Sequence, residues 1–269
     1  MKKFLCFFCL LWSFLGCTAQ YDTAQIKPVK TVKGNYTDFT VDNLGNFYVL
    51  TRSNQLKKLN PAGDSISVYN DVRRYGKVHA LDATNPLKLL LYYKDFGTVV
   101  VLDRFLNVRT TINLRERNLF QVKAISQSYD NNIWLYDEQE ARLKKLDEEG
   151  NLLSQFSDFR QGLDATPSPV RIIDYDRQLY LYDPAAGLFI FDYFGTLKTK
   201  LSLLGWQDFQ VVDNKVFGRK NGVLQQYQPG SLQLKAFALG TGFAKADKLI
   251  ISPRFLYILR EGSVQVYSF

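Results

Sequence analysis

The stretch NNIWLYDEQEARLKKLDEEGNLLSQF, from Asn131 to Phe156, contains three short apolar runs separated by polar turns. The first run ends at an acidic turn. The second run alternates apolar and polar residues and ends at the turn Glu-Glu-Gly-Asn, and the third run follows directly. Glycine and asparagine accept the positive φ of tight turns, so this spacing is typical of successive antiparallel strands. The stretch therefore predicts strand, turn, strand, turn and strand within one short unit.

The same unit recurs along nearly the whole chain. Aligning the first apolar run of each unit gives spacings of 40, 44, 48, 39 and 39 residues between Val41, Leu81, Ile125, Ile173, Val212 and Ile251. Four short strands in each unit of about forty residues, repeated about six times, indicate a β-propeller. The predicted fold is therefore all-β, a six-bladed β-propeller of four-stranded antiparallel blades.

The two ends of the chain predict how the ring closes. The last unit stops after SVQVYSF, its third strand, so its fourth strand is missing. A spare apolar segment, QIKPVKTVK from Gln25, precedes the first complete unit. If this N-terminal strand completes the last blade, it removes the exposed edge that an open array would leave.

Two units, TVDNLGNFYVLTRSNQLKKLNPAGD from Thr40 and SYDNNIWLYDEQEARLKKLDEEGN from Ser128, carry a resemblance to a known family. They resemble NHL-type and related six-bladed propeller repeats, including those of sensor-type periplasmic propellers. The resemblance implies the propeller fold over nearly all of the chain. It implies little about function, because propellers host binding, scaffolding and catalysis alike.

The first nineteen residues form the pattern of a secretory signal peptide. Lys2 and Lys3 precede an apolar core that is too short to span a bilayer, and small residues follow it. Residues 20–269 then form a single propeller domain, exported to the periplasm, the outer membrane or the exterior. Two alternatives stay open at the N-terminus: cleavage after Ala19, or lipidation of Cys17 within the lipobox-like sequence Leu-Gly-Cys.

Composition excludes several kinds of site. The three cysteines, Cys6, Cys9 and Cys17, all lie in the N-terminal segment, which excludes disulfides and thiol chemistry in the domain. Without Lys2 and Lys3 the chain has 32 basic and 26 acidic residues, a net charge of +6. The basic residues are scattered and form no tract of the length expected for nucleic-acid binding, so we expect no nucleic-acid partner.

Catalytic motifs are missing from the sequence. His79 is the only histidine, and no Gly-x-Ser-x-Gly sequence, phosphate-binding loop or dinucleotide fingerprint accompanies it. A lone histidine at the start of a strand is typical of a channel-lining or loop position. We therefore predict no catalytic residue and no cofactor.

The repeat alignment nevertheless brings charged residues to equivalent positions. His79, Lys123 and Arg171 share one position at the start of consecutive first strands. First strands line the channel of a propeller, so these side chains predict a basic arc that suits an anion or an acidic peptide terminus. Asp38 and Asp208, in the matching stretches YTDF and WQDF, predict acidic groups opposite. The alternative is that all five are solvated strand starts without a ligand.

Carboxylates also recur just after the aligned first-strand positions. In six-bladed lactonases and related hydrolases, which this fold resembles, a divalent metal is bound in the channel. Asp174 and Asp213 are the candidate ligands for such a metal here. Aspartate at this place is also the usual first residue of a turn, where it binds backbone amides. The turn interpretation predicts no metal site.

The sequence favours an exported, non-enzymatic interaction module that binds a protein, peptide or glycan in the cell envelope. Long polar loops beginning at Arg73, Arg115 and Asp158 precede first strands, and loops on a rigid scaffold are where binding usually occurs. The expected partner is another envelope protein or an acidic ligand, with membrane contact only through a lipid on Cys17. The alternative is a metal-dependent hydrolase of the lactonase or lyase type with its site in the central channel.

Overall fold

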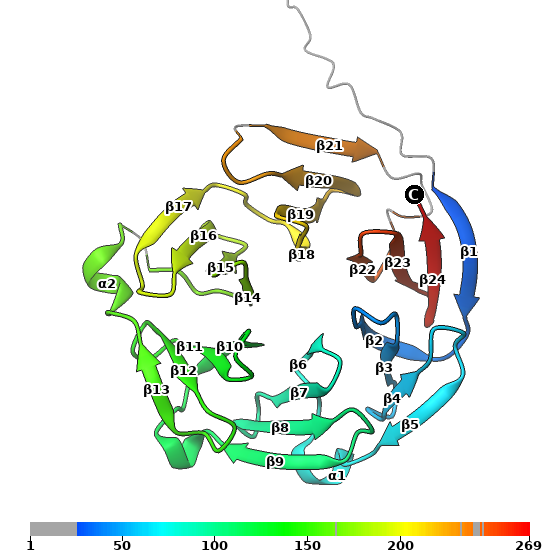
Figure 1. Cartoon of the computed structure of the whole chain (residues 1–269), viewed down its shortest axis with the longest axis horizontal. Helices are drawn as coiled ribbons and strands as arrows, with labels where there is room; N and C mark the ends of the chain where they lie inside the picture. Colours follow the sequence, from blue (N-terminus) through cyan, green and yellow to red (C-terminus); the bar gives the residue numbers. More distant parts are fainter. Residues whose placement is uncertain (1–25, 165, 232, 239–242, 244) are drawn as a thin grey trace, which may run out of the picture.

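Six four-stranded antiparallel sheets surround one axis in the computed structural model (Figure 1). The structure describes residues 26–269 except 165, 232, 239–242 and 244. In each sheet the first strand lies innermost and the fourth lies outermost. The predicted six-bladed β-propeller is therefore confirmed, and all six aligned residues lie in innermost strands.

The first three blades take their strands in chain order. Blade 1 contains β2 (Tyr36–Val41), β3 (Phe47–Thr51), β4 (Leu56–Leu59) and β5 (Ser65–Tyr69). Blade 2 contains β6 (Ala80–Asn85), β7 (Lys88–Tyr93), β8 (Thr98–Asp103) and β9 (Val108–Asn113). Blade 3 contains β10 (Val122–Gln127), β11 (Ile133–Asp137), β12 (Arg142–Leu146) and β13 (Leu152–Gln155).

The last blade takes its outer strand from the other end of the chain. Blade 4 contains β14 (Arg171–Tyr175), β15 (Gln178–Asp183), β16 (Gly187–Asp192) and β17 (Leu197–Leu201). Blade 5 contains β18 (Gln207–Val212), β19 (Lys215–Lys220), β20 (Val223–Tyr227) and β21 (Leu234–Ala238). Blade 6 contains β22 (Lys248–Ile251), β23 (Phe255–Arg260), β24 (Ser263–Ser268) and, outermost, β1 (Lys27–Val32).

The N-terminal strand therefore completes the last blade, as the sequence predicts. β1 pairs antiparallel with β24, from Lys27 opposite Ser268 to Val32 opposite Val264. The expected segment began at Gln25, which lies outside the described residues, as do the signal-peptide residues and Cys17. Among the residues that are described, no helix has the length and apolar character needed to cross a membrane.

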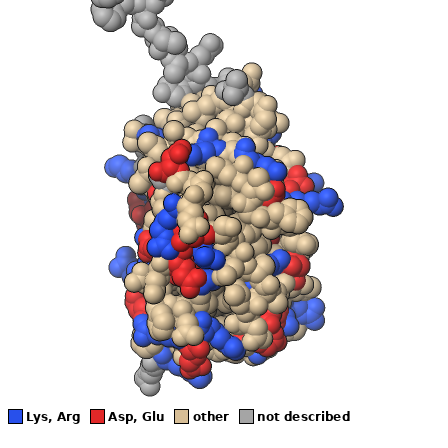
Figure 2. Space-filling model, turned by 90° about the vertical axis from the view of Figure 1, so that its left-hand side faces the viewer, with Lys and Arg blue, Asp and Glu red and all other residues tan. Residues whose placement is uncertain are grey.

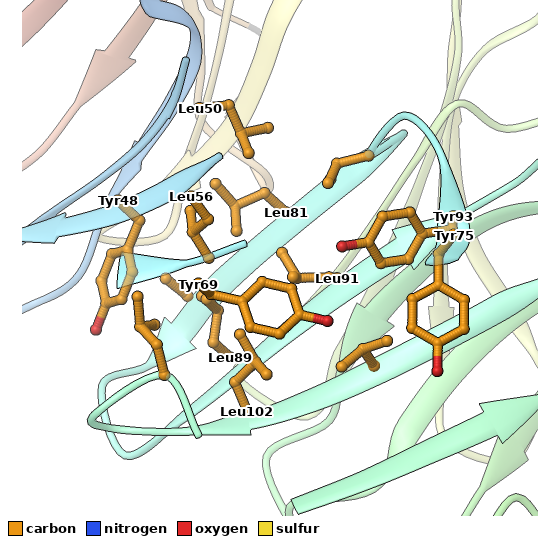
Figure 3. Close-up of a cluster of buried hydrophobic side chains, with 14 residues drawn as sticks. Tyr48, Leu50, Leu56, Tyr69, Tyr75, Leu81, Leu89, Leu91, Tyr93 and Leu102 are labelled. Carbon is orange, nitrogen blue, oxygen red and sulfur yellow. The ribbon is translucent and has the colours of Figure 1, made fainter. Parts of the chain in front are cut away.

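The core consists of apolar layers between neighbouring blades. One layer packs Tyr48, Leu50 and Leu56 of blade 1 against Leu81, Leu91 and Leu102 of blade 2 (Figure 3). The middle strands read as near-continuous apolar runs, because both of their faces are covered by adjacent blades. Buried tyrosines use their hydroxyls to join blades, as Tyr92 does by donating to the Val122 carbonyl at 2.9 Å.

The ring has two distinct faces. On the loop face, long connections lead to the innermost strands of the next blade, and those entering blades 2, 3 and 4 contain α1 (Val72–Tyr75), η1 (Arg115–Arg117) and α2 (Phe159–Gly162). On the turn face, short turns join first to second strands and third to fourth strands. Positive and negative side chains are interspersed over the side of the ring seen in Figure 2. The three loops expected to share one face therefore do so.

Candidate functional site

The innermost strands of all six blades line a central cavity of about 630 Å³. Its wall is polar at many positions, and it contains the carboxylates and cations Asp38, Asp82, Asp174, Asp208, Asp247, Arg171 and Lys248. Asp38, Arg171 and Lys248 lie at or near the starts of their innermost strands and line this cavity. The cavity is therefore the place where groups from different blades meet.

A smaller cavity of about 120 Å³ lies at the loop-face end of the channel. Its polar lining comes from five different blades: Asp38, His79, Lys123, Arg171 and Lys248. The structure thus brings together the three residues of the predicted basic arc and one of the two predicted aspartates. We call these five residues the mouth cluster.

The ion pairs of the mouth cluster leave one cation unoccupied. Lys248 contacts Asp38 across the junction of blades 6 and 1, with 2.7 Å between Nζ and Oδ1. Lys123 is 3.6 Å from the carboxylate of Glu138. Arg171 has neither a hydrogen bond nor an ion pair with its side chain among the described residues, although it is partly buried. A guanidinium that keeps all of its donors free at a channel mouth is suited to an incoming anion.

More cations surround His79. An adjoining cavity of about 310 Å³ is lined by Lys77, His79, Lys94 and Asp95, together with Thr37 and Asp38. Burial lowers the pKa of His79, and the positive charges of Lys94, Lys123 and Lys77 lower it further, while Asp95 opposes them. The imidazole packs edge-on against Tyr92, with ring centroids 5.8 Å apart. The local field therefore disfavours an additional proton and favours an anion.

Lys248 is the member of the mouth cluster that the sequence prediction missed. It begins β22, the innermost strand of blade 6, and pairs with Leu259 of the second strand as Arg171 of β14 pairs with Tyr182. Alignment on Ile251 places Leu249 at the position of Lys123 and Arg171, so the spacing of the repeat does not reveal Lys248. Its pairing with Asp38 depends on ring closure.

Asp208 has a different environment from the one predicted for it. Its carboxylate accepts a hydrogen bond from Nε of Arg219 at 2.8 Å, and both side chains are buried. Arg219 also donates to the Ala246 carbonyl at 2.8 Å. Burial raises the pKa of Asp208, while the Arg219 charge acts in the opposite direction. Asp208 lines the central cavity, but the mouth cavity does not contain it.

The two aspartates proposed as alternative metal ligands line different cavities. Asp174 lines the central cavity and accepts hydrogen bonds from Ser128 (2.8 Å), Trp134 (3.0 Å) and Tyr193 (2.5 Å). Asp213 has a positive φ of 48° in the turn after β18, beside an apolar cavity between blades 5 and 6. Within the described ranges, no group of three or more His, Cys, Asp or Glu side chains is arranged to hold a metal ion.

Replacing Asp174 tests whether it is a structural residue or a metal ligand. Asp174→Ala leaves four donors from blades 3 and 4 without their acceptor, the three side chains above and the Tyr129 N–H, so we expect the free energy of unfolding to fall by about 1–3 kcal/mol. Chemical denaturation of both proteins, with and without a chelator, measures this loss. Stoichiometric calcium or zinc in the purified protein, lost in Asp174→Asn or Asp213→Asn, would instead support the metal-dependent hydrolase.

Solved structures similar to this chain share its fold. Selenomethionine-substituted virginiamycin B lyase from Staphylococcus aureus has a TM-score of 0.64 and 9% identity over 91% of this chain and 99% of that one. The β-propeller domain of Cps50 (Swd1) from Myceliophteria thermophila has a TM-score of 0.62 and 10% identity over 91% and 99%. YCF48 bound to D1 peptide has a TM-score of 0.57 and 10% identity over 93% and 100%.

These similarities place the chain among the β-propellers and go no further, because identities of 9–10% show the fold alone. No protein-family model matches the chain, and no curated protein matches its sequence. The similar structures include both an enzyme and a protein bound to a peptide, so the fold is compatible with either function. The function of this chain must therefore be inferred from the geometry of its site.

Proposed function

We infer that this chain is a non-enzymatic β-propeller that binds an acidic segment of a protein or peptide at the mouth cluster. The observation that carries the proposal is Arg171, a partly buried guanidinium that has no protein acceptor among the described residues and shares a cavity with His79, Lys123 and Lys248. A carboxylate placed there would receive paired, charge-assisted hydrogen bonds from Arg171. It would also relieve the mutual repulsion of the surrounding cations.

The size of the cavities supports a side chain or chain terminus as the bound group. The mouth cavity of about 120 Å³ holds roughly four water molecules at their liquid volume of about 30 Å³ each, which matches one carboxylate group with its immediate hydration. The adjoining cavity of about 310 Å³ could hold the next residue of an extended peptide beside Lys77 and Lys94. YCF48 bound to D1 peptide is an example of this fold with a peptide ligand.

The cellular setting belongs to the same proposal. The signal-peptide pattern of residues 1–19 supports export, and an exported propeller would meet its partner in the cell envelope. Lipidation of Cys17 would attach the domain to a membrane without a spanning segment. The long connections that contain α1, η1 and α2 enter blades 2, 3 and 4 on the same face as the mouth and would supply further contacts to a partner.

Calorimetric titration with a short peptide rich in Asp and Glu tests the proposal, with the corresponding Asn and Gln peptide as the control. We expect micromolar binding of the acidic peptide alone, weakened by salt because part of the site is exposed. Equal binding of the two peptides, or no binding of either at low salt, would refute an acidic ligand.

His79 predicts a pH dependence of this binding. Burial and the neighbouring lysines lower the pKa of His79 in the folded protein, so its imidazole is charged to a smaller extent at a given pH than that of a free histidine. A bound carboxylate favours the protonated form, so affinity rises as pH falls below about 6.5, by at most about tenfold per pH unit.

The measurement is the peptide dissociation constant between pH 7.5 and 5 for the wild type and for His79→Gln. The other groups around His79 are Lys77, Lys94, Lys123, Arg171 and Lys248, with Asp38, Asp95 and Glu138 on the acidic side. The increase should therefore disappear in His79→Gln, and an identical increase in both proteins would assign it to another group.

A further inference from the structure

The turn face carries six large apolar side chains that contribute little to the core. Each is more than half exposed: Leu44 (64%), Leu87 (59%), Phe105 (53%), Tyr129 (69%), Phe194 (94%) and Phe269 (55%). Five of them occupy turns of blades 1 to 4, and Phe269 follows β24 in blade 6. Tight turns are normally built from polar residues, glycine and proline. Single exposed apolar side chains are ordinary on a protein surface, but six on one face of the ring are a feature that a contact outside the chain would explain.

The turns hold these side chains outward by one repeated device. In four of them a side-chain oxygen accepts a hydrogen bond from the N–H of the apolar residue two positions later. The pairs are Asp42 with Leu44 (3.0 Å), Asn85 with Leu87 (2.9 Å), Asp103 with Phe105 (2.8 Å) and Asp192 with Phe194 (3.0 Å). The apolar residue is thus fixed at the tip of its turn. We call the six residues the tip set.

The same device changes the electrostatics of the turn face. Asp103 and Asp192 also bind the N–H two residues beyond the tip, at 2.8 and 2.9 Å. Their oxygens therefore point into the turns. Lys198 lowers the pKa of Asp192, and the backbone bonds lower it further. Burial opposes the effect at Asp103, but the hydrogen bonds from Asn107 and Phe105 leave the pKa of that carboxyl lowered. Arg104 lies over the Phe105 ring at 4.6 Å and supplies a positive charge beside that tip. Both carboxylates therefore remain negatively charged in their turns, and Arg104 offsets the charge of Asp103 beside the Phe105 tip.

From this arrangement we propose that the turn face of the propeller rests on the surface of a lipid bilayer, with the tip set inserted at the level of the headgroups. The six side chains are distributed around the ring and separated by polar turns, so they do not form the continuous apolar centre of a protein–protein interface. A fluid bilayer accepts separated apolar side chains one by one. Interfacial phenylalanine, tyrosine and leucine with nearby arginine are typical of such contacts.

The path of the chain supports the bilayer as the occupant. Lys27, the first residue of β1, pairs with Ser268 at the turn-face end of blade 6. Ile26 lines an apolar cavity of about 250 Å³ between blades 5 and 6, together with Phe269 and Pro253. The N-terminal segment therefore joins the domain at the turn face, and Cys17 lies ten positions before Lys27. The mouth cluster opens on the opposite face and stays available to a partner.

Co-sedimentation with vesicles of phosphatidylcholine and phosphatidylglycerol tests the proposal, using the chain from residue 20 onward so that no lipid anchor contributes. We expect the wild type to bind, with little change between low and high salt, because insertion of apolar groups dominates. Leu87→Ser, Phe105→Ser and Phe194→Ser together should lower the partition coefficient at least tenfold. The matched control is Phe96→Ser with Phe120→Ser, which removes two similarly exposed side chains from the loop face (52% and 59%).

A fluorescent reporter tests insertion without relying on the triple variant, which could lose binding through a folding defect. Phe194→Trp should shift its emission to shorter wavelength when vesicles are added, whereas Phe120→Trp should not. The triple variant should bind the acidic peptide like the wild type, which separates this proposal from the proposed function. Failure of the wild type to bind vesicles, equal losses in the loop-face control, or a tip-dependent dimer in place of vesicle binding would each overturn the bilayer contact.

Discussion

Reversing two charges of the mouth cluster, with Lys123→Glu and Arg171→Glu in one protein, is expected to weaken binding of the acidic peptide by at least about 100-fold. The change removes two attractive charges and adds two repulsive ones in a partly buried cavity. Truncating one partner of a desolvated charge pair alone costs about 2–5 kcal/mol of binding energy. A 100-fold loss corresponds to only about 2.8 kcal/mol, so the expected effect is a lower bound.

The melting temperature should stay nearly unchanged in this double variant. Arg171 has no hydrogen-bonding or ionic partner to lose among the described residues, and Lys123 loses only a 3.6 Å contact with Glu138 in a partly exposed setting. The matched control is Lys27→Glu with Lys235→Glu, two exposed residues of the outer strands β1 and β21, which changes the net charge by the same amount. Binding that survives in the mouth variant, or falls equally in the control, would contradict the proposed site.

The repeat made the architecture readable from the sequence. Each blade repeats the same apolar and turn pattern, so aligning Val41 with Ile251 was enough to place the innermost strands without any tertiary information. The unpaired third strand at the C-terminus then indicated that β1 closes the ring. These inferences depend only on local patterning and on the need to cover a sheet edge, which a sequence records directly.

The alignment could also bring His79, Lys123 and Arg171 to one mouth, because equivalent positions of a ring are neighbours in space. It could not reveal which charges are already occupied. Asp208 and Arg219 lie on adjacent strands of one blade, and only the strand register brings their side chains together. Asp38 and Lys248 meet because the ring closes between the first and last blades. Ion pairs that depend on strand register or on ring closure cannot be predicted from the spacing of residues within one repeat.

The exposure of the tip set could not be predicted from the sequence either. The turn Asp-Arg-Phe-Leu-Asn, residues 103–107, contains two adjacent apolar residues, and nothing in its sequence shows which of them is buried. In the structure Leu106 is 4% exposed and Phe105 is 53% exposed. The difference arises because Leu106 adopts a positive φ of 68° and turns its side chain toward the apolar layer between blades 1 and 2. Only the backbone path separates the core residue from the exposed one.

Removing β1 is expected to destabilise the whole ring, because this strand joins the first residues of the domain to the last blade. Its buried residue Val32 packs with Val264, Val266 and Leu259 of blade 6, and also with Leu59 of blade 1. Without β1, blades 1 and 6 keep the contacts of their inner strands, such as Phe47 against Tyr257, but they lose the packing of Val32, and β24 becomes an unpaired edge.

A chain that begins at residue 34 should therefore melt more than about 10 °C below a chain that begins at Ile26, since a domain of this size loses about 2–4 °C per kcal/mol. Val32→Ala gives a graded version, with an expected loss of about 1–2 kcal/mol from a deleted buried side-chain volume. Thermal melts with light scattering measure both, and the shortened chain should also aggregate through the free edge of β24. A shortened chain that stays monomeric and melts with the longer one would show that the ring is held by the interfaces between blades and not by its closing strand.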